Sequence, residues 1–173
     1  MTASTAHFIN GDAMSFLAKE PVHPASPPEG PDVTIASAPF WPEISLGDLR
    51  KVMRLDGNVT AERLKEAVIE AISNTNGQLR AWRVEQEAAG VLKLEAVESE
   101  QVAGESMRVQ RYRRAVYCHA KANLTERYRD MDTTGDGNKR ADALDPNITD
   151  LWRDARWAIS DVQGRERGIA ELV

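Results

Sequence analysis

The sequence has little of several residue types, and each shortage narrows what the protein can be. Cys118 is the one cysteine among 173 residues, so no disulfide can form within the chain and a reducing compartment suits it. Aromatic residues make up only 6% of the chain, which predicts an aliphatic core with a few placed rings. Long hydrophobic runs are missing, and the first residues lack the basic start and apolar stretch of a signal peptide. We therefore expect neither a membrane span nor a leader.

Net charge and length limit the class of protein and the number of domains. The formal net charge is -5, which argues against a general nucleic-acid-binding protein, although a local basic face remains compatible with it. The hydrophobic fraction of 42% in 173 residues predicts one globular domain with a real core. No internal repeat is present.

The stretch from Glu105 to Asp132 is predicted to be the central helix of an all-α bundle. Neither proline nor glycine interrupts it, and Gly104 and Gly135 bracket it. Apolar residues recur in it every three or four positions, which places them on one side of a helix. They are Val109, Tyr112, Val116, Ala120, Leu124, Tyr128 and Met131.

Basic residues of the same stretch fall on the opposite side of the helix. This basic row comprises Arg108, Arg111, Arg114, Lys121 and Arg129. Such a row is solvated or paired with neighbouring acids, or it meets an acidic surface of another subunit, with nucleic acid as a third alternative. Arg113 and Arg127 instead project into the apolar stripe. A buried guanidinium needs a carboxylate, supplied within the chain or by another subunit, unless the side chain snorkels to water.

The chain divides into three predicted parts. Residues 1–44 form an extended N-terminal arm rich in proline, in which Phe40 and Trp41 before Pro42 act as an aromatic anchor on the folded body. Residues 45–163 form the helical bundle, and residues 164–173 form a C-terminal tail.

Two helices are predicted before the central one. Ser45 caps a helix over 46–55, and Thr60 caps a helix over 61–89 that ends at Gly90. The inner face of the first comprises Leu46, Leu49, Val52 and Met53. The inner face of the second comprises Leu64, Val68, Ala71, Ile72, Thr75, Leu79 and Trp82, and its outer row comprises Glu62, Glu66 and Glu70. Residues 91–104 are a connector with at most one short helical turn.

The last helix is predicted to start at Asp145–Pro146 and to stop at Gly164. Its inner face comprises Ile148, Leu151, Trp152, Ala155, Ala158, Ile159 and Val162. Trp157 points the other way. It meets either a second packing layer of the same chain or another protein, because tryptophan is enriched where proteins meet.

No metal, cofactor or catalytic site is predicted. The loop from Asp130 to Asp136 resembles the opening of an EF-hand, but its twelfth position is Ala141, or Ala143 in the alternative register, so the closing carboxylate is missing. A solvated turn explains this loop better than a calcium site. Cys118 and His119 are adjacent and project about 100° apart, so they cannot share a metal by themselves. No nucleophile and base can be paired from the sequence, so we expect no enzyme.

Several short segments resemble, in the same order, the head-completion protein family (GPL type) of contractile-tailed bacteriophages. The resemblance covers about residues 38–168. The segments are Phe40–Ile44, Met53–Leu55, Arg63–Ala67, Leu124–Arg129, Asp150–Ala158 and Gln163–Gly164.

The resemblance implies a structural virion protein without catalysis. Members of such a family finish the DNA-filled head, assemble as a ring beneath the dodecameric portal and provide the surface on which the tail or its terminator protein docks. The implied partners are other copies of the chain, portal and tail proteins, with packaged DNA only nearby in the channel. The implied place is the neck of the virion, reached from the host cytoplasm during assembly. The alternative is a soluble helical regulator or adaptor that binds a partner protein.

The residues that we expect at partner contacts come from the anchor, the central helix and the outward side of the last helix. They are Phe40, Trp41, Arg108, Arg111, Arg114, Arg127, Arg129, Arg156 and Trp157.

Overall fold

The computed structural model describes residues 32–55, 59–131 and 135–165, and within these it describes side chains outside 128–146. The helices are α1 (Leu46–Val52), α2 (Ala61–Gln78), α3 (Arg80–Ala88), α4 (Met107–Met131) and α5 (Gly135–Gln163), with a 3-10 turn at Leu94–Ala96. The strands are β1 (Thr34–Ile35), β2 (Ile44–Ser45), β3 (Gln101–Val102) and β4 (Glu105–Ser106). The fold is therefore mostly helical, as predicted.

Two short antiparallel strand pairs were not predicted. Strands β1 and β2 pair with Thr34 opposite Ser45, and β3 and β4 pair with Gln101 opposite Ser106. Each strand is two residues long, which is too short to give the alternating pattern by which strands are found in a sequence.

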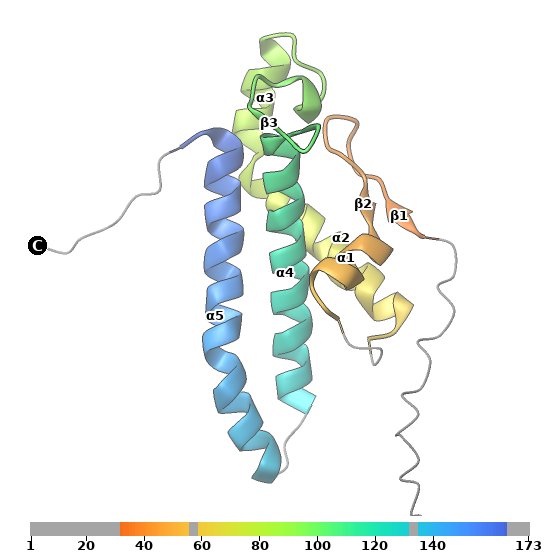
Figure 1. Cartoon of the computed structure of the whole chain (residues 1–173), viewed down its shortest axis with the longest axis vertical. Helices are drawn as coiled ribbons and strands as arrows, with labels where there is room; N and C mark the ends of the chain where they lie inside the picture. Colours follow the sequence, from red (N-terminus) through yellow and green to blue (C-terminus); the bar gives the residue numbers. More distant parts are fainter. Residues whose placement is uncertain (1–31, 56–58, 132–134, 166–173) are drawn as a thin grey trace, which may run out of the picture.

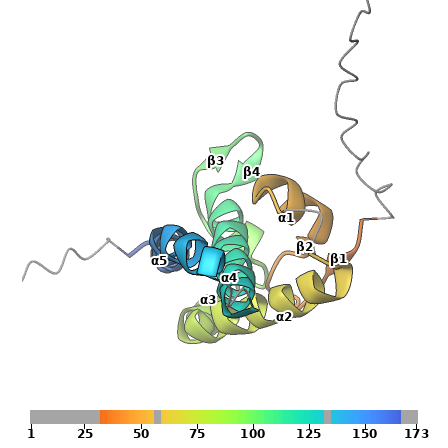
Figure 2. The ribbon, with the colours of Figure 1, turned by 90° about the horizontal axis from the view of Figure 1, so that it is seen from below.

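Helix α4 lies at the centre of the molecule (Figures 1 and 2). Helix α5 runs antiparallel beside it, α2 crosses it on another side, and α1 with the β1–β2 hairpin covers a third. The predicted apolar stripe of α4 is buried from Val109 to Leu124, while Tyr128 and Met131 lie outside the described side chains. Ala115, Cys118 and Ala122 are buried as well, so this helix is covered on more than one side.

The predicted helix over 61–89 is in fact two helices. Helix α2 begins after Thr60, whose side chain accepts from Arg63 N as predicted, but it ends at Gln78, and α3 begins after Leu79. The break at Leu79 comes two residues after Gly77. A glycine inside a helix weakens it by about 1 kcal/mol relative to alanine, which favours a break nearby. The predicted inner face stays buried across the break, from Leu64 to Trp82.

The predicted start of the last helix is wrong. Helix α5 begins at Gly135, well before Asp145–Pro146. The intervening residues include Lys139, Arg140 and Ala141, which favour helix without supplying an apolar face. The predicted end is correct, because α5 stops at Gln163 and Gly164 follows with a φ of 70°.

Helix α1 is shorter than predicted. Ser45 caps it by accepting from Asp48 N at 2.9 Å, but the helix ends at Val52, whose side chain is 59% exposed rather than buried. Val52 is the last residue of the helix, and Met53 after it is half-buried against the core. Asp32 strengthens the start of α1 by accepting from Ser45 Oγ (2.6 Å) and Gly47 N (2.9 Å), and these bonds lower the pKa of its carboxyl.

The aromatic anchor is part of the core. Phe40 and Trp41 are 2% and 5% exposed. Trp41 stacks on Tyr112 with ring centroids 4.8 Å apart, and Phe40 meets the edge of Trp82 at 6.1 Å. Residues 32–44 thus belong to the folded body, so the described part of the predicted arm is not a free extension.

Candidate interaction surfaces

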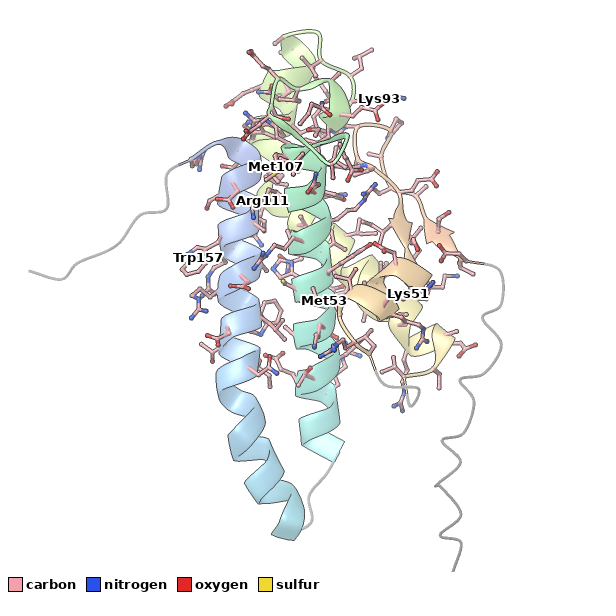
Figure 3. All side chains as sticks on the ribbon, in the orientation of Figure 1. Lys51, Met53, Lys93, Met107, Arg111 and Trp157 are labelled. Atoms are coloured by element: carbon pink, nitrogen blue, oxygen red, sulfur yellow. The ribbon has the colours of Figure 1, made fainter. Side chains whose placement is uncertain are left out.

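The basic row of α4 is directed mainly toward α5. Arg114 Nη2 lies 2.9 Å from Asp154 Oδ2, and Arg111 Nε lies 3.4 Å from Asp161 Oδ2. Figure 3 shows Arg111 at this seam. These guanidinium groups therefore have carboxylate partners within the chain, which is the intramolecular alternative weighed from the sequence.

Arg108 closes the end of the same seam. It donates hydrogen bonds to the main-chain oxygens of Glu98 (3.1 Å) and Val162, and its guanidinium lies 5.7 Å from the ring centroid of Trp82. Because the main-chain oxygens of the last turn of a helix lack partners within that helix, Arg108 satisfies one at the end of α5.

The remaining basic side chains of α4 have different environments. Lys121 donates to Met53 O at 2.8 Å, after the end of α1. Arg113 pairs with Glu105 at 2.7 Å, so of the alternatives for this guanidinium the structure has the carboxylate within the chain. Arg127 is exposed, which agrees with the alternative that its long side chain bends away from the apolar stripe to water. The side chain of Arg129 lies outside the described ones.

A buried polar cluster joins helices α2, α4 and α5, and it was not predicted from the sequence. His119 Nδ1 and Thr75 Oγ1 share a hydrogen bond of 3.1 Å, and both residues are buried. The Trp152 ring lies 5.2 Å from the imidazole, and its Nε1 donates to Glu126 Oε1 at 2.7 Å. Burial lowers the pKa of His119, so its neutral form is favoured. These contacts fix the positions of α2, α4 and α5, and the ring and hydroxyl are closed to solvent.

Cys118 has the environment of a structural thiol. Its side chain is buried, and this burial raises the pKa of the thiol. A protonated, enclosed thiol is a poor nucleophile. Across the described residues, no group of three or more His, Cys, Asp or Glu side chains is placed to hold a metal ion. The EF-hand-like loop at Asp130–Asp136 lies outside the described side chains.

The outward side of α5 carries an exposed aromatic residue, as predicted. Trp157 is 39% exposed and points away from α4 (Figure 3). The Arg153 guanidinium lies over this ring, 4.8 Å from its centroid, and also pairs with Asp150 at 2.6 Å. Arg156 is exposed beside them. A cation over a partly exposed indole makes a surface that is both apolar and positively charged.

The outward side of α2 has the opposite charge. Glu62, Glu66 and Glu70 are exposed, as predicted, and Ile69 is 42% exposed among them. Arg63 and Lys65 are exposed basic residues at the two edges of this patch. Because residues three and four apart share a helix face, these side chains form one continuous surface.

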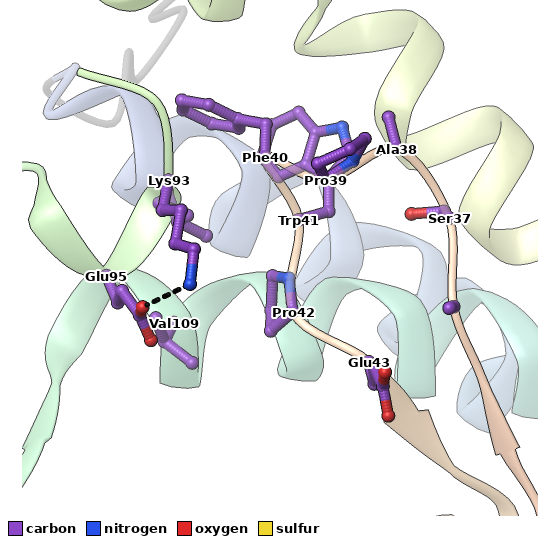
Figure 4. Close-up of a pocket in the computed structure, with 12 residues that line it drawn as sticks. Ser37, Ala38, Pro39, Phe40, Trp41, Pro42, Glu43, Lys93, Glu95 and Val109 are labelled. Atoms are coloured by element: carbon purple, nitrogen blue, oxygen red, sulfur yellow. Dashed lines mark ion pairs between the residues drawn. The ribbon is translucent and has the colours of Figure 1, made fainter.

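The loop around the anchor forms an open pocket of about 270 Å³ (Figure 4). Its rim includes Lys93 and Glu95, whose charged groups lie 3.4 Å apart. Phe40 and Trp41 are among its lining residues and are buried within the chain, so their role as partner-contacting residues stays a prediction. Their side chains contact Tyr112 and Trp82 of the same chain.

The helices in the described part of the chain include none with the length and apolar character needed to cross a membrane. In the described residues, the candidate sites are surface patches of charged and aromatic side chains on a helical body. This arrangement is that of a structural or binding protein.

Comparison with known proteins identifies the family. The family described as phage head completion protein (GPL) matches residues 35–173. The head completion/stabilization protein of Escherichia phage P2 is 39% identical over 146 residues, which span 84% of this chain and 86% of that relative. The chain belongs to the GPL family of phage head completion proteins. No solved structure gives a significant match.

Membership confirms the resemblance found in the sequence and its main consequence. The family is one of structural head completion proteins and is not an enzyme family. The protein is accordingly a component of the virion in its head–tail region.

Proposed function

We propose that this protein is a subunit of a ring that lies beneath the portal and provides the surface on which the tail, or its terminator protein, docks after DNA packaging. The ring takes the dodecameric symmetry of the portal, and packaged DNA passes nearby in the channel. The subunit reaches this neck position from the host cytoplasm during assembly. Family membership supports the general role, since a completed head must receive a tail.

The observation that carries this proposal is the outward side of α5. Trp157, Arg153 and Arg156 lie on the side of the helix opposite its buried face. A large aromatic ring that is partly exposed gains stability when another protein covers it, and tryptophan and arginine dominate the binding energy of many interfaces.

Electron microscopy of the purified protein mixed with purified portal protein tests the proposal. We expect a ring of density on the tail-proximal side of the portal, and a mass in solution that rises when portal is added. A protein that stays a monomer or dimer and adds no density to the portal would contradict the ring. That result would favour the soluble adaptor, which binds a partner protein without forming a ring.

A further inference from the structure

Two exposed helix faces of this chain have complementary chemistry. The acidic face of α2 comprises Glu62, Lys65, Glu66, Ile69, Glu70 and Ser73, and all six residues are exposed. The basic face of α5 comprises Thr149, Asp150, Arg153, Arg156, Trp157 and Ser160. Each face has one partly exposed large apolar side chain near its middle, Ile69 at 42% and Trp157 at 39%.

The two faces cannot meet within one molecule. Helices α2 and α5 both pack on α4, from different sides, and their buried faces converge on His119 through Thr75 and Trp152. The outer faces therefore point away from each other. A contact between two different faces of identical subunits is head-to-tail, and it closes into a ring when the rotation between neighbours divides a full turn.

We infer that the acidic face of α2 in one subunit docks against the basic face of α5 in the next subunit of the ring. This inference rests on the proposed function and adds the partner and the contacting faces. Ile69 packs against Trp157 at the centre, which removes both from water. Glu66 and Glu70 lie opposite Arg156 and Arg153 around this apolar centre, an arrangement typical of interfaces in which polar side chains exclude water from a few anchoring residues.

The basic row of α4 is a weaker candidate for the same partner. Arg111 and Arg114 form ion pairs with Asp161 and Asp154 of α5, and Arg108 bonds to main-chain oxygens. A partner would have to break these contacts before binding. On the outer face of α5, the contacts of Arg153 with Asp150 and with the Trp157 ring lie within that one helix, so a partner could replace them without separating α4 from α5.

Charge reversal on each face gives a direct test. In Arg156→Glu every junction of the ring would oppose the new carboxylate to Glu66, and in Glu66→Arg every junction would oppose the new guanidinium to Arg156. We expect each variant alone to incorporate into portal-bound rings at least about tenfold less than the wild type. An equimolar mixture of the two should assemble, because in an alternating ring every junction again joins opposite charges.

Controls separate this interface from folding and from the proposed function. Both variants should unfold within about 0.5 kcal/mol of the wild type, since both positions are exposed. Glu85→Arg makes the same charge change on the exposed side of α3 and should incorporate normally. If the wild type forms rings but the mixture of folded variants incorporates no better than either alone, the interface is elsewhere and the ring stands. If the wild type itself forms no ring on portal, both the interface and the proposed function are overturned.

Discussion

The two sides of α5 have similar charged residues in different surroundings. On the side that meets α4, Asp154 and Asp161 pair with arginines of the same chain. On the outward side, Arg153 and Arg156 surround a partly exposed Trp157. The comparison teaches that a regular charged row in a sequence does not by itself mark a binding surface. The most regular row, on α4, forms ion pairs within the chain, while the shorter group on α5 is the one that we propose to contact a partner.

The largest expected effect is on the inward side, at Trp152. Trp152→Ala removes a ring that packs on His119 and a hydrogen bond to Glu126. We expect the free energy of unfolding to fall by about 2–4 kcal/mol, because the ring is only partly buried and the loss stays below that of a full core cavity. Denaturant unfolding measures it. A loss under about 1 kcal/mol would mean that the polar cluster does not hold α5 in place.

The next effect concerns pH and the same cluster. Burial lowers the pKa of His119, a main-chain hydrogen bond opposes this, and the charge of Arg156 adds to the lowering. The unfolded chain takes up this proton near pH 6.5, before the folded chain does, so stability is full above that pH and falls as the pH drops toward the folded pKa. The loss is at most about 1.4 kcal/mol per pH unit.

His119→Gln keeps a hydrogen-bonding side chain beside Thr75 but cannot titrate. We expect its stability to depend less steeply on pH between about 7 and 5 than that of the wild type, as measured by denaturant unfolding at each pH. Since every other titrating group is common to both proteins, the difference between the two slopes isolates this residue. Parallel slopes would show that His119 does not resist protonation in the folded state.

The smallest effect is expected at the seam between α4 and α5. The Arg114–Asp154 pair spans 2.9 Å, but the two side chains are 52% and 27% exposed. A double-mutant cycle with alanine at both positions should give a coupling of about 0.2–1 kcal/mol, reduced in high salt. A coupling that is larger and insensitive to salt would contradict this, and would mean that the ion pairs between α4 and α5 are a main source of stability.

Periodicity predicted the fold where one pattern dominates. It identified α4 and the inner faces of α2 and α5. The residue types Ser45 and Thr60 identified the N-caps of α1 and α2. Periodicity could not find the two-residue strands, nor the break at Leu79, where the apolar pattern continues while the backbone bends. The early start of α5 was missed because favourable helix residues without an apolar face look like a polar loop.

The surfaces were harder to predict than the helices. A helical projection shows that Arg111 and Arg114 lie opposite the apolar stripe, but not that a second helix covers that side and supplies carboxylates. It placed Trp157 outward correctly, because the buried face of α5 is well defined. The pairing of Thr75 with His119 joins residues 44 positions apart, and local patterns carry no information on such contacts.

Trp157→Ala gives the most direct test of the claim that the outward side of α5 serves assembly while its inward side serves the fold. Two quantities are measured on the same variant: the free energy of unfolding of the isolated protein, and its incorporation into portal-bound particles. We predict unfolding within about 1 kcal/mol of the wild type and assembly weakened by about 2 kcal/mol or more per contact. If Trp157→Ala instead unfolds as easily as Trp152→Ala, or assembles as well as the wild type, Trp157 is not an interface residue and the account is contradicted.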